Sequence, residues 1–280
     1  MPILTRIDAF RKKLESLKKE HLVELCDRLG VDPRGGKADL IIHLLADNIL
    51  VQEARIDDFI KEKYQELVDQ RRRIIPDEQL KTELQRVETF DWGVIQGDLD
   101  QKIQRGFVRR FYRFQELVQA VERNLYPEIL NYAICSWYNY WSTVLLEEQI
   151  ALHPRIVPTL KNIKGVDIFF DGQPFDLKIT YLPQGYNPQE AVLNPRELAR
   201  YLYEHQGRER FGADNRLFIV LFNMHQPQES WKLKREFDFV LPKIEEFLQR
   251  EQVSEEDEII FTYRNQTYSA LAKILLIYRD

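Results

Sequence analysis

The sequence is poor in cysteine and glycine and has no long apolar run. Its 280 residues include 2 cysteines and 11 glycines. Cys26 and Cys135 lie far apart and outside any CxxC motif, a usage typical of a reducing intracellular compartment, so we expect a cytoplasmic protein. Charged residues interrupt every apolar run well before the roughly 20 residues that cross a bilayer, so we expect no membrane partner.

Several common enzyme motifs are also absent. The chain has no HExxH pair, no glycine-rich phosphate loop and no GxSxG elbow, and its 5 histidines show no zinc-like pairing. The net charge of −5 argues mildly against a protein that coats nucleic acid nonspecifically, because such binding needs lysine and arginine to neutralise phosphates. It does not exclude a local basic surface, since acidic clusters elsewhere lower the sum.

The length and composition predict a globular chain with more than one part. The 280 residues exceed the size of about 100–200 that is usual for one domain, while 44% are apolar and 30% charged. Helical patterns fill the first part of the chain, and strand-like segments begin after residue 150. We therefore expect an α/β (α+β) protein with an all-helical N-terminal region, divided into segments 1–50, 51–125 and 126–280.

The first segment reads as short helices. The strings HLVELCDRLGV (21–31) and GKADLI (36–41) resemble the SAP module, a helix–linker–helix unit associated with DNA binding. Backbone N–H groups at the start of the second helix, with Lys37 beside them, are suited to hold a phosphate. The alternative is a plain helical hairpin that packs on the main domain.

The second segment contains a basic run. Residues 101–113 include Lys102 and four arginines and no acidic residue. On one continuous helix, Arg105, Arg109 and Arg113 would share one face, with Arg110 beside them, and Phe107, Phe111 and Phe114 would line another. Such a guanidinium stripe suits a DNA-contact element. A solvated helix face is the alternative.

The third segment has a helix–strand order that can be read along the chain. We expect a helix at 127–150 with Ile134, Trp137, Trp141, Val144 and Leu145 on its apolar side. Strands then follow at 156–160, 166–170 and 175–181, a helix that Pro195 opens at 195–204, and a strand at 216–222. Beyond them we expect an amphipathic helix at 229–250 and edge elements at 258–263 and 275–278.

The second and third of these strands form a hairpin. Asp171-Gly172 is a strong two-residue turn signal, because both turn positions need positive φ. This turn pairs residue 170 with 173, 169 with 174, 168 with 175, and Asp167 with Asp176. Lys178 then lies on the same face as Asp176.

Two carboxylates opposite each other repel unless a cation lies between them. Mg²⁺ fits, because it takes a few protein oxygens, here Asp167, Asp176 and the Leu177 carbonyl, and leaves other positions to water and phosphate. Lys178 would orient or deprotonate the attacking water, or stabilise the transition state. The alternative is an Asp167–Lys178 salt bridge on an exposed sheet face, with Asp176 incidental.

The string GVDIFFDGQPFDLKIT (165–180), within its helix–strand–strand–strand–helix–strand order, resembles the PD-(D/E)XK nuclease superfamily. The resemblance covers about residues 127–222, and Val166 stands where proline is usual. It implies an αβββαβ restriction-endonuclease-like core with a mixed central sheet and Mg²⁺-dependent phosphodiester hydrolysis, with Asp167 and Asp176 as metal ligands and Lys178 as the catalytic lysine. It also implies a glutamate from the preceding helix, for which Glu147 is the first choice and Glu148 the second.

Together with the SAP-like segment, this resemblance implies a nuclease acting on double-stranded DNA, in particular a restriction enzyme. A repair or recombination nuclease that reads DNA structure, and a DNA-binding scaffold without activity, are the alternatives. The intact Asp167, Asp176 and Lys178 count against the scaffold. A homodimer would match the two-fold symmetry of a palindromic site.

Overall fold

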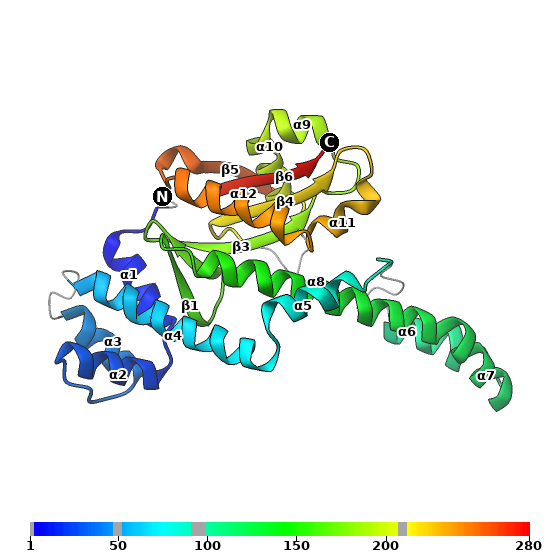
Figure 1. Cartoon of the computed structure of the whole chain (residues 1–280), viewed down its shortest axis with the longest axis horizontal. Coiled ribbons are helices and arrows are strands. Elements are labelled where there is room, and N and C mark those ends of the chain that lie inside the picture. Colours follow the sequence, from blue (N-terminus) through cyan, green and yellow to red (C-terminus); the bar gives the residue numbers. More distant parts are fainter. Residues whose placement is uncertain (1–2, 47–51, 91–98, 207–211) are drawn as a thin grey trace. The chain divides into compact units, whose positions relative to one another are not determined.

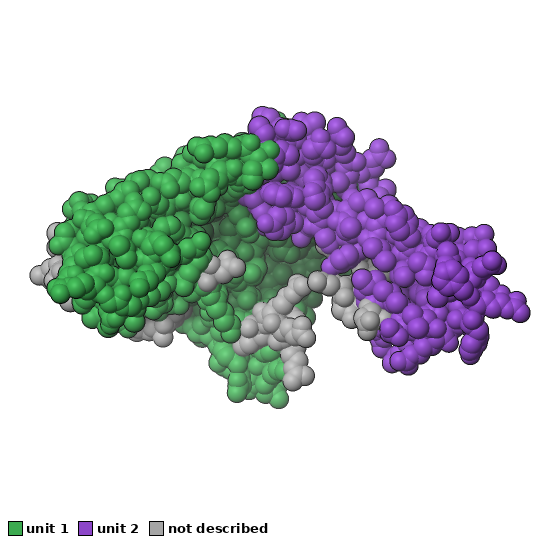
Figure 2. Space-filling view, turned by 90° about the horizontal axis from the view of Figure 1, so that it is seen from below, with its two compact units in different colours: residues 1–74, 146–280 green, residues 75–145 purple. Residues whose placement is uncertain are grey.

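The structure is a computed structural model that describes residues 3–46, 52–90, 99–206 and 212–280. Contacts divide the chain into two compact units (Figure 2). The first unit consists of residues 1–74 and 146–280, and the second unit consists of residues 75–145. The boundary at residue 145 falls within helix α8 (Tyr126–Ala151). These two units are defined by contacts within the chain, whereas the three expected segments were defined by residue type.

The N-terminal part of the first unit is helical, as expected. Thr5 caps the first helix, because its hydroxyl accepts a hydrogen bond from the Asp8 N–H at 3.2 Å. Gly30 ends the second helix in the left-handed conformation, at φ 70°. The helices are α1 (Arg6–Glu15), α2 (Lys19–Leu29), α3 (Lys37–Ala46) and α4 (Glu53–Ile74) (Figure 1).

These helices pack against the sheet. One apolar cluster contains Leu14, Leu25 and Phe59 from the helices together with Val157 and Phe169 from the first two strands. All five side chains are buried. The segment that resembles the SAP module therefore shares its core with the sheet of the same unit.

The first unit holds a mixed six-stranded sheet in the order β1-β2-β3-β4-β6-β5. Strands β1, β2 and β3 pair antiparallel, β3, β4 and β6 pair parallel, and β5 pairs antiparallel with β6. The strands are β1 (Ile156–Ile163), β2 (Val166–Phe170), β3 (Gln173–Tyr181), β4 (Arg216–Asn223), β5 (Glu258–Tyr263) and β6 (Gln266–Arg279). The expected mixed sheet and α+β class are confirmed.

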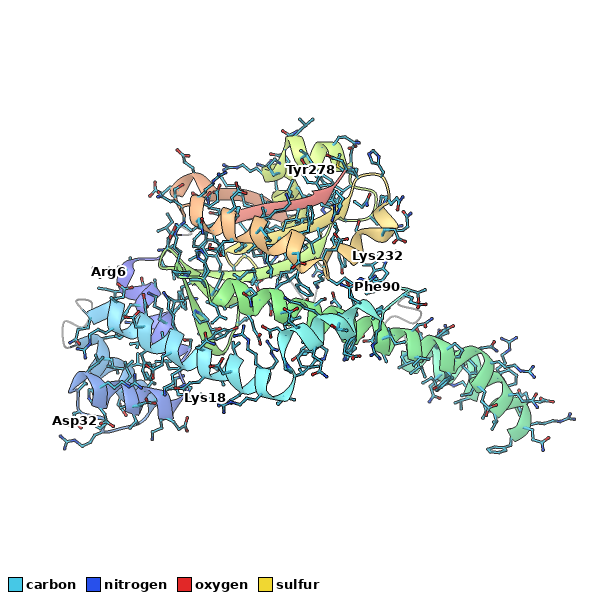
Figure 3. All side chains as sticks on the ribbon, in the orientation of Figure 1. Arg6, Lys18, Asp32, Phe90, Lys232 and Tyr278 are labelled. Carbon is cyan, nitrogen blue, oxygen red and sulfur yellow. The ribbon has the colours of Figure 1, made fainter. Side chains whose placement is uncertain are left out.

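The expectation for the last strand was wrong. β6 is a long inner strand between β4 and β5, whereas an edge element at 275–278 was expected. Its position follows from pairing with β4 along Arg216↔Ala272 to Asn223↔Arg279, a contact between distant parts of the chain that local pattern does not reveal. Tyr278, near the end of β6, is labelled in Figure 3. Its ring stacks on Phe222 of β4 with ring centroids 5.2 Å apart.

Helices cover both faces of the central strand β4, whose residues are buried from Arg216 to Phe222. On one face, α9 (Pro188–Leu193) and α10 (Pro195–Glu204) pack on Phe218 and Val220. On the other lie α11 (Ser230–Leu233) and α12 (Phe237–Arg250) (Figure 1). The single helix expected at 229–250 is thus two helices, while Pro195 opens α10 as expected.

Helix α8 has the expected extent, but its buried side agrees with the expected one only in part. Leu145 is buried as expected, and Cys135 and Tyr138 are buried as well, whereas Ile134 and Trp137 are each 38% exposed. Residues 129–146 contain no charged side chain, so the helix is apolar or uncharged all round and its sequence does not define one apolar face.

The second unit consists of helices around a small cluster of Phe107, Ala120 and Leu125. It contains α5 (Asp77–Gln85), α6 (Leu99–Ile103), the π-helical turns η3 (Gln104–Val108) and η4 (Val121–Leu125), α7 (Phe114–Ala120) and the first part of α8. Within the described ranges of the whole chain, no helix combines the length and apolarity that crossing a membrane requires.

Candidate active site

The β2–β3 hairpin has the expected turn and register. Asp171 and Gly172 both have positive φ, at 48° and 78°. The pairs are Phe170↔Gln173, Phe169↔Pro174 and Ile168↔Phe175, as the turn predicted. Asp171 is also fixed through its carboxylate, which accepts hydrogen bonds from Arg155 Nη2 at 2.7 Å.

Beyond these pairs the two strands separate. The Asp167 carboxylate accepts the Leu177 N–H at 2.8 Å, and the Asp176 N–H donates to the Asn215 carbonyl at 2.8 Å. The fourth expected pair, Asp167 with Asp176, is therefore replaced by a side chain that enters between the strands. Since the N–H and C=O of one strand residue point to the same side, the Leu177 carbonyl also faces β2 at this opening.

Asp176 is held by two cations. Its Oδ1 accepts from Lys178 Nζ at 2.7 Å and its Oδ2 accepts from Arg216 Nε at 3.0 Å. Arg216 is buried and its guanidinium stacks on Tyr203, 4.8 Å from the ring centroid. The Lys178 side chain is 46% exposed and reaches solvent. The alternative of a salt bridge between Asp167 and Lys178 was wrong, because Lys178 pairs with Asp176.

Asp167 has no such partner. Within the described part of the chain, no lysine or arginine nitrogen lies within 4.0 Å of its carboxylate. Loss of surrounding water raises the pKa of Asp167, the Leu177 N–H opposes that rise, and the neighbouring Asp176 adds to it. Lys178 lowers the pKa of Asp167 through its charge, but the net shift is upward. Asp167 is therefore a carboxyl group beside a second carboxylate, and no lysine or arginine is paired with it among the described residues.

The structure distinguishes the two candidate glutamates on α8. Glu148 is buried and its carboxylate accepts hydrogen bonds from Arg71, with Nε at 3.1 Å from Oε1. Glu147 instead lies near enough to the hairpin for its charges to act on it: burial and the charge of Asp167 raise the pKa of Glu147 to about 7. Glu147 thus belongs to the acidic cluster, and Glu148 belongs to an ion pair within the first unit.

Two cations of this cluster were missed in the sequence. Lys234 is buried 5.8 Å from the Tyr181 ring centroid, and burial lowers its pKa to about 8 although Glu147 raises it. Arg216 was read only as the start of an apolar strand. Neither residue carries a local signal, since both reach the cluster through contacts between distant parts of the chain.

The residues present fit a divalent cation in type. Among the described residues, no three His, Cys, Asp or Glu side chains already converge on one point as a complete metal cage. Mg²⁺ does not need such a cage, because it keeps several waters and binds through one or two carboxylates plus substrate phosphate. Asp167, Asp176 and the Leu177 carbonyl would hold it. Among the described residues, no lysine or arginine side chain forms an ion pair with the Asp167 carboxylate.

Lys37 is engaged inside the protein. Its Nζ donates to the Glu15 carbonyl at 2.9 Å and to the Leu17 carbonyl at 2.5 Å. The Gly36 N–H, which was expected to meet a phosphate, donates to the Asp39 carboxylate at 2.7 Å. In this conformation the start of α3 satisfies its own donors, so the structure adds no support for phosphate binding there.

The basic run does not form one continuous helix. The π-helical turn η3 ends at Val108, and Arg113 has an extended conformation with φ −102° and ψ 131°. The expected shared face of Arg105, Arg109 and Arg113 was therefore wrong. All four arginines of the run are exposed, Arg110 included.

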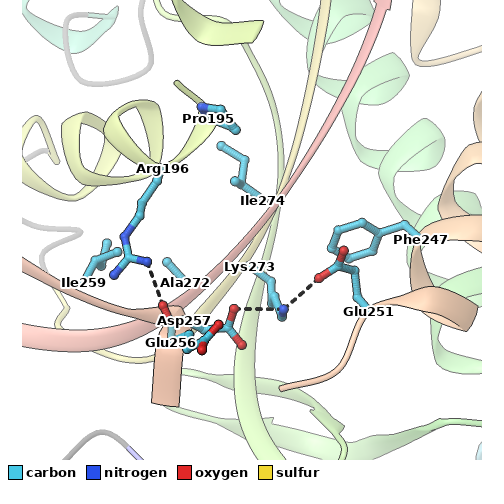
Figure 4. A pocket seen from close by; sticks show the side chains of 10 residues that line it. All are labelled: Pro195, Arg196, Phe247, Glu251, Glu256, Asp257, Ile259, Ala272, Lys273 and Ile274. Carbon is cyan, nitrogen blue, oxygen red and sulfur yellow. Dashed lines mark hydrogen bonds and ion pairs between the residues drawn. The ribbon is translucent and has the colours of Figure 1, made fainter. Parts of the chain in front are cut away.

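A second charged cluster lies elsewhere on the sheet, in a pocket of about 180 Å³ (Figure 4). Lys273 of β6 is buried and its Nζ pairs with Glu251 and Asp257, each at 2.8 Å. Arg196 closes the pocket by donating to the Glu256 carbonyl at 2.7 Å. Lys273, Glu251, Asp257 and Arg196 each have an opposite charge or a backbone carbonyl as partner, so we interpret this cluster as a structural network.

Comparisons with protein-family models, with curated proteins and with solved structures found no match.

Proposed function

We propose that the chain is a Mg²⁺-dependent endonuclease of double-stranded DNA, of the PD-(D/E)XK type. One observation carries the proposal: the Asp167 carboxylate lies beside Asp176 without a cation of its own, at a point where β2 and β3 separate. Lys178 follows two residues after Asp176 and its ammonium reaches solvent. Two carboxylates that can bind a metal ion, with a lysine ammonium beside them, suit phosphodiester hydrolysis.

The chain's own residues have distinct roles in this proposal. Asp167 and Asp176 bind the ion, and Arg216 fixes the Asp176 carboxylate from its buried side. When bound, Mg²⁺ supplies Lewis acidity and a more acidic water. Lys178 places a positive charge where the phosphate gains negative charge in the transition state. Glu147, with its pKa near neutrality, can accept a proton close to the same point.

The exposed arginines of the second unit are the proposed DNA contacts. Arg105, Arg109, Arg110 and Arg113 face solvent, so they are available to phosphates. The SAP-like segment stays in the proposal through its sequence alone. Lys37 would have to leave its two carbonyls before it could bind a phosphate.

Cleavage of both strands of a symmetric site matches a two-fold protein, so a homodimer is part of the proposal for a restriction enzyme. Both cysteines are buried and neither forms a disulfide bond in the described part of the chain, which agrees with the proposed cytoplasmic setting.

The test is cleavage of a defined supercoiled plasmid by the purified full chain with Mg²⁺ and, as a control, with EDTA. Discrete fragments that need Mg²⁺ would support a restriction enzyme. Cleavage restricted to flaps, junctions or looped duplexes would support the structure-specific alternative. No cleavage of any of these DNAs with Mg²⁺ or Mn²⁺ would contradict the proposal and leave the inactive scaffold.

A further inference from the structure

The second unit exposes two aromatic side chains and one aliphatic side chain in one short segment. Tyr112 is 97% exposed, Phe114 is 78% exposed and Val108 is 51% exposed. A tyrosine at 97% makes almost no contact with its own chain. Large apolar groups that gather at one exposed place mark a surface that meets a partner.

The backbone explains why these rings point outward. Phe107 is buried, and the N–H groups of Arg110 and Phe111 both donate to its carbonyl at 3.2 Å, which ends the helical turn. Phe111 packs on Phe107 with ring centroids 6.5 Å apart. The chain is then extended at Arg113 until α7 begins at Phe114. Two inward rings thus anchor the segment, and Tyr112 and Phe114 remain outside. We name residues 108–114 the aromatic tip.

The aromatic tip and the segment before it carry only positive charges in the sequence. No acidic residue occurs between positions 101 and 115, and the four exposed arginines lie in or next to the tip. Glu116 contacts Arg113 at 3.4 Å, and both side chains are more than half exposed. Aromatic rings interleaved with guanidinium groups fit a polyanion whose units also present flat faces for stacking, which describes nucleic acid.

We infer that the aromatic tip is a base-stacking element that prefers DNA with unpaired bases. A regular duplex offers the arginines its phosphates, but it keeps its base faces stacked inside. A loop, a flap or a frayed end exposes those faces, and Tyr112 and Phe114 can then stack on them. The inference rests on the proposed function only for its partner, DNA, and it adds a preference between DNA structures.

The experiment measures binding of the full chain by fluorescence anisotropy with Ca²⁺ present. The two probes are a 24-base-pair duplex and the same duplex with a central loop of four unpaired nucleotides. We expect the wild type to bind the looped probe about tenfold more tightly, as stacking of one or two bases gives. Y112A/F114A should lose this preference and change its affinity for the plain duplex less than threefold.

Tyr126→Ala is the matched control, because Tyr126 is a 61% exposed tyrosine of the same unit outside the basic run. It should keep the preference. Equal binding of both probes by the wild type, or an unchanged preference in Y112A/F114A, would overturn the inference. Binding to phosphatidylserine–phosphatidylcholine vesicles that Y112A/F114A loses, with DNA binding unchanged, would overturn it in favour of a membrane surface.

Mg²⁺-dependent cleavage, measured in parallel, separates this inference from the proposed function. A preference for the looped probe without any cleavage would leave the inference standing and refute the nuclease. Cleavage without the preference would refute the inference alone.

Discussion

Two charged clusters on the same sheet differ in how their charges are matched. Around Lys273, one buried ammonium lies between the carboxylates of Glu251 and Asp257. Around Asp176, two cations bind one carboxylate, while the adjacent Asp167 has no cation within 4.0 Å among the described residues. The first arrangement matches each charge with an opposite one, and the second leaves the carboxyl group of Asp167 without a cationic partner among the described residues.

The pKa shifts separate the clusters in the same way. Burial alone would lower the pKa of Lys273, but its hydrogen bonds to Asp257 and Glu251 raise it, so the charged form is favoured. In the other cluster burial raises the pKa of Glu147 to about 7 and lowers that of Lys234 to about 8, so the neutral forms gain. Charged groups that the fold leaves uncompensated are typical of functional sites, whereas matched networks are typical of stabilising ones.

The largest expected difference between the clusters is in cleavage. Asp176→Asn should reduce Mg²⁺-dependent cleavage by about a hundredfold or more, because a metal ligand and the charge that holds Lys178 are lost together. Asp257→Asn, the same substitution in the matched network, should leave the rate of the folded protein unchanged. The measurement is the initial cleavage rate of each variant at 25 °C. An equal loss of rate in both variants would contradict the difference proposed between the two clusters.

Asp176→Asn also has a structural cost that the sequence did not indicate. The repulsion expected between two facing aspartates would by itself predict that Asp176→Asn loses no stability. The structure shows that Asp176 faces the buried Arg216, so the variant leaves a guanidinium with a neutral amide as its partner. Circular dichroism must therefore confirm that the variant is folded under the assay conditions.

The next prediction compares two lysines by stability. Lys273→Met should lower the free energy of unfolding by about 3 kcal/mol, since it leaves two carboxylates around an apolar side chain. Lys178→Met should change it by about 1 kcal/mol or less, because that lysine is 46% exposed and its partner keeps Arg216. Urea unfolding followed by tryptophan fluorescence measures both, and the reverse order would contradict the comparison.

The smallest expected effect is the pH dependence that Glu147 contributes. Its pKa is about 7 in the folded protein against an ordinary value of 4.5, so between these values the folded state holds a proton that the unfolded state has lost. Stability therefore falls as pH rises through this window. Glu147→Gln should be about 1–2 kcal/mol more stable than the wild type at pH 8 without metal, part of the gain being offset by Lys234.

Urea midpoints at pH 4.5 and pH 8 in EDTA check this prediction. The two proteins should differ at pH 8 and agree at pH 4.5. A constant difference at both values would show that Glu147 does not titrate in this window.

The sequence predicted what local signals determine. Asp171-Gly172 imposes one turn, and that turn sets the pairing of Phe170 with Gln173 and thus the positions of Asp167 and Asp176. The bounds of α8 and α10 followed in the same way from periodicity and from Pro195.

Contacts between distant parts of the chain could not be predicted. Arg216 reaches Asp176 only because β3 and β4 pair in parallel with these two residues in register. Lys234 enters the same cluster from a short helix after β4. The break in the basic run likewise depends on the burial of Phe107, which helical spacing alone does not reveal. Local pattern therefore located the acidic pair, and tertiary packing supplied its partners.

The most direct test of the central claim uses Lys178→Met and separates binding from turnover. DNA binding is measured with Ca²⁺, which occupies oxygen sites without the geometry of Mg²⁺, and cleavage of the same DNA is measured with Mg²⁺. If Lys178 stabilises the transition state, the variant binds DNA like the wild type and loses most of its turnover, because Asp167, Asp176 and the Leu177 carbonyl remain. Wild-type cleavage by the folded variant would show that Lys178 is only the salt-bridge partner of Asp176.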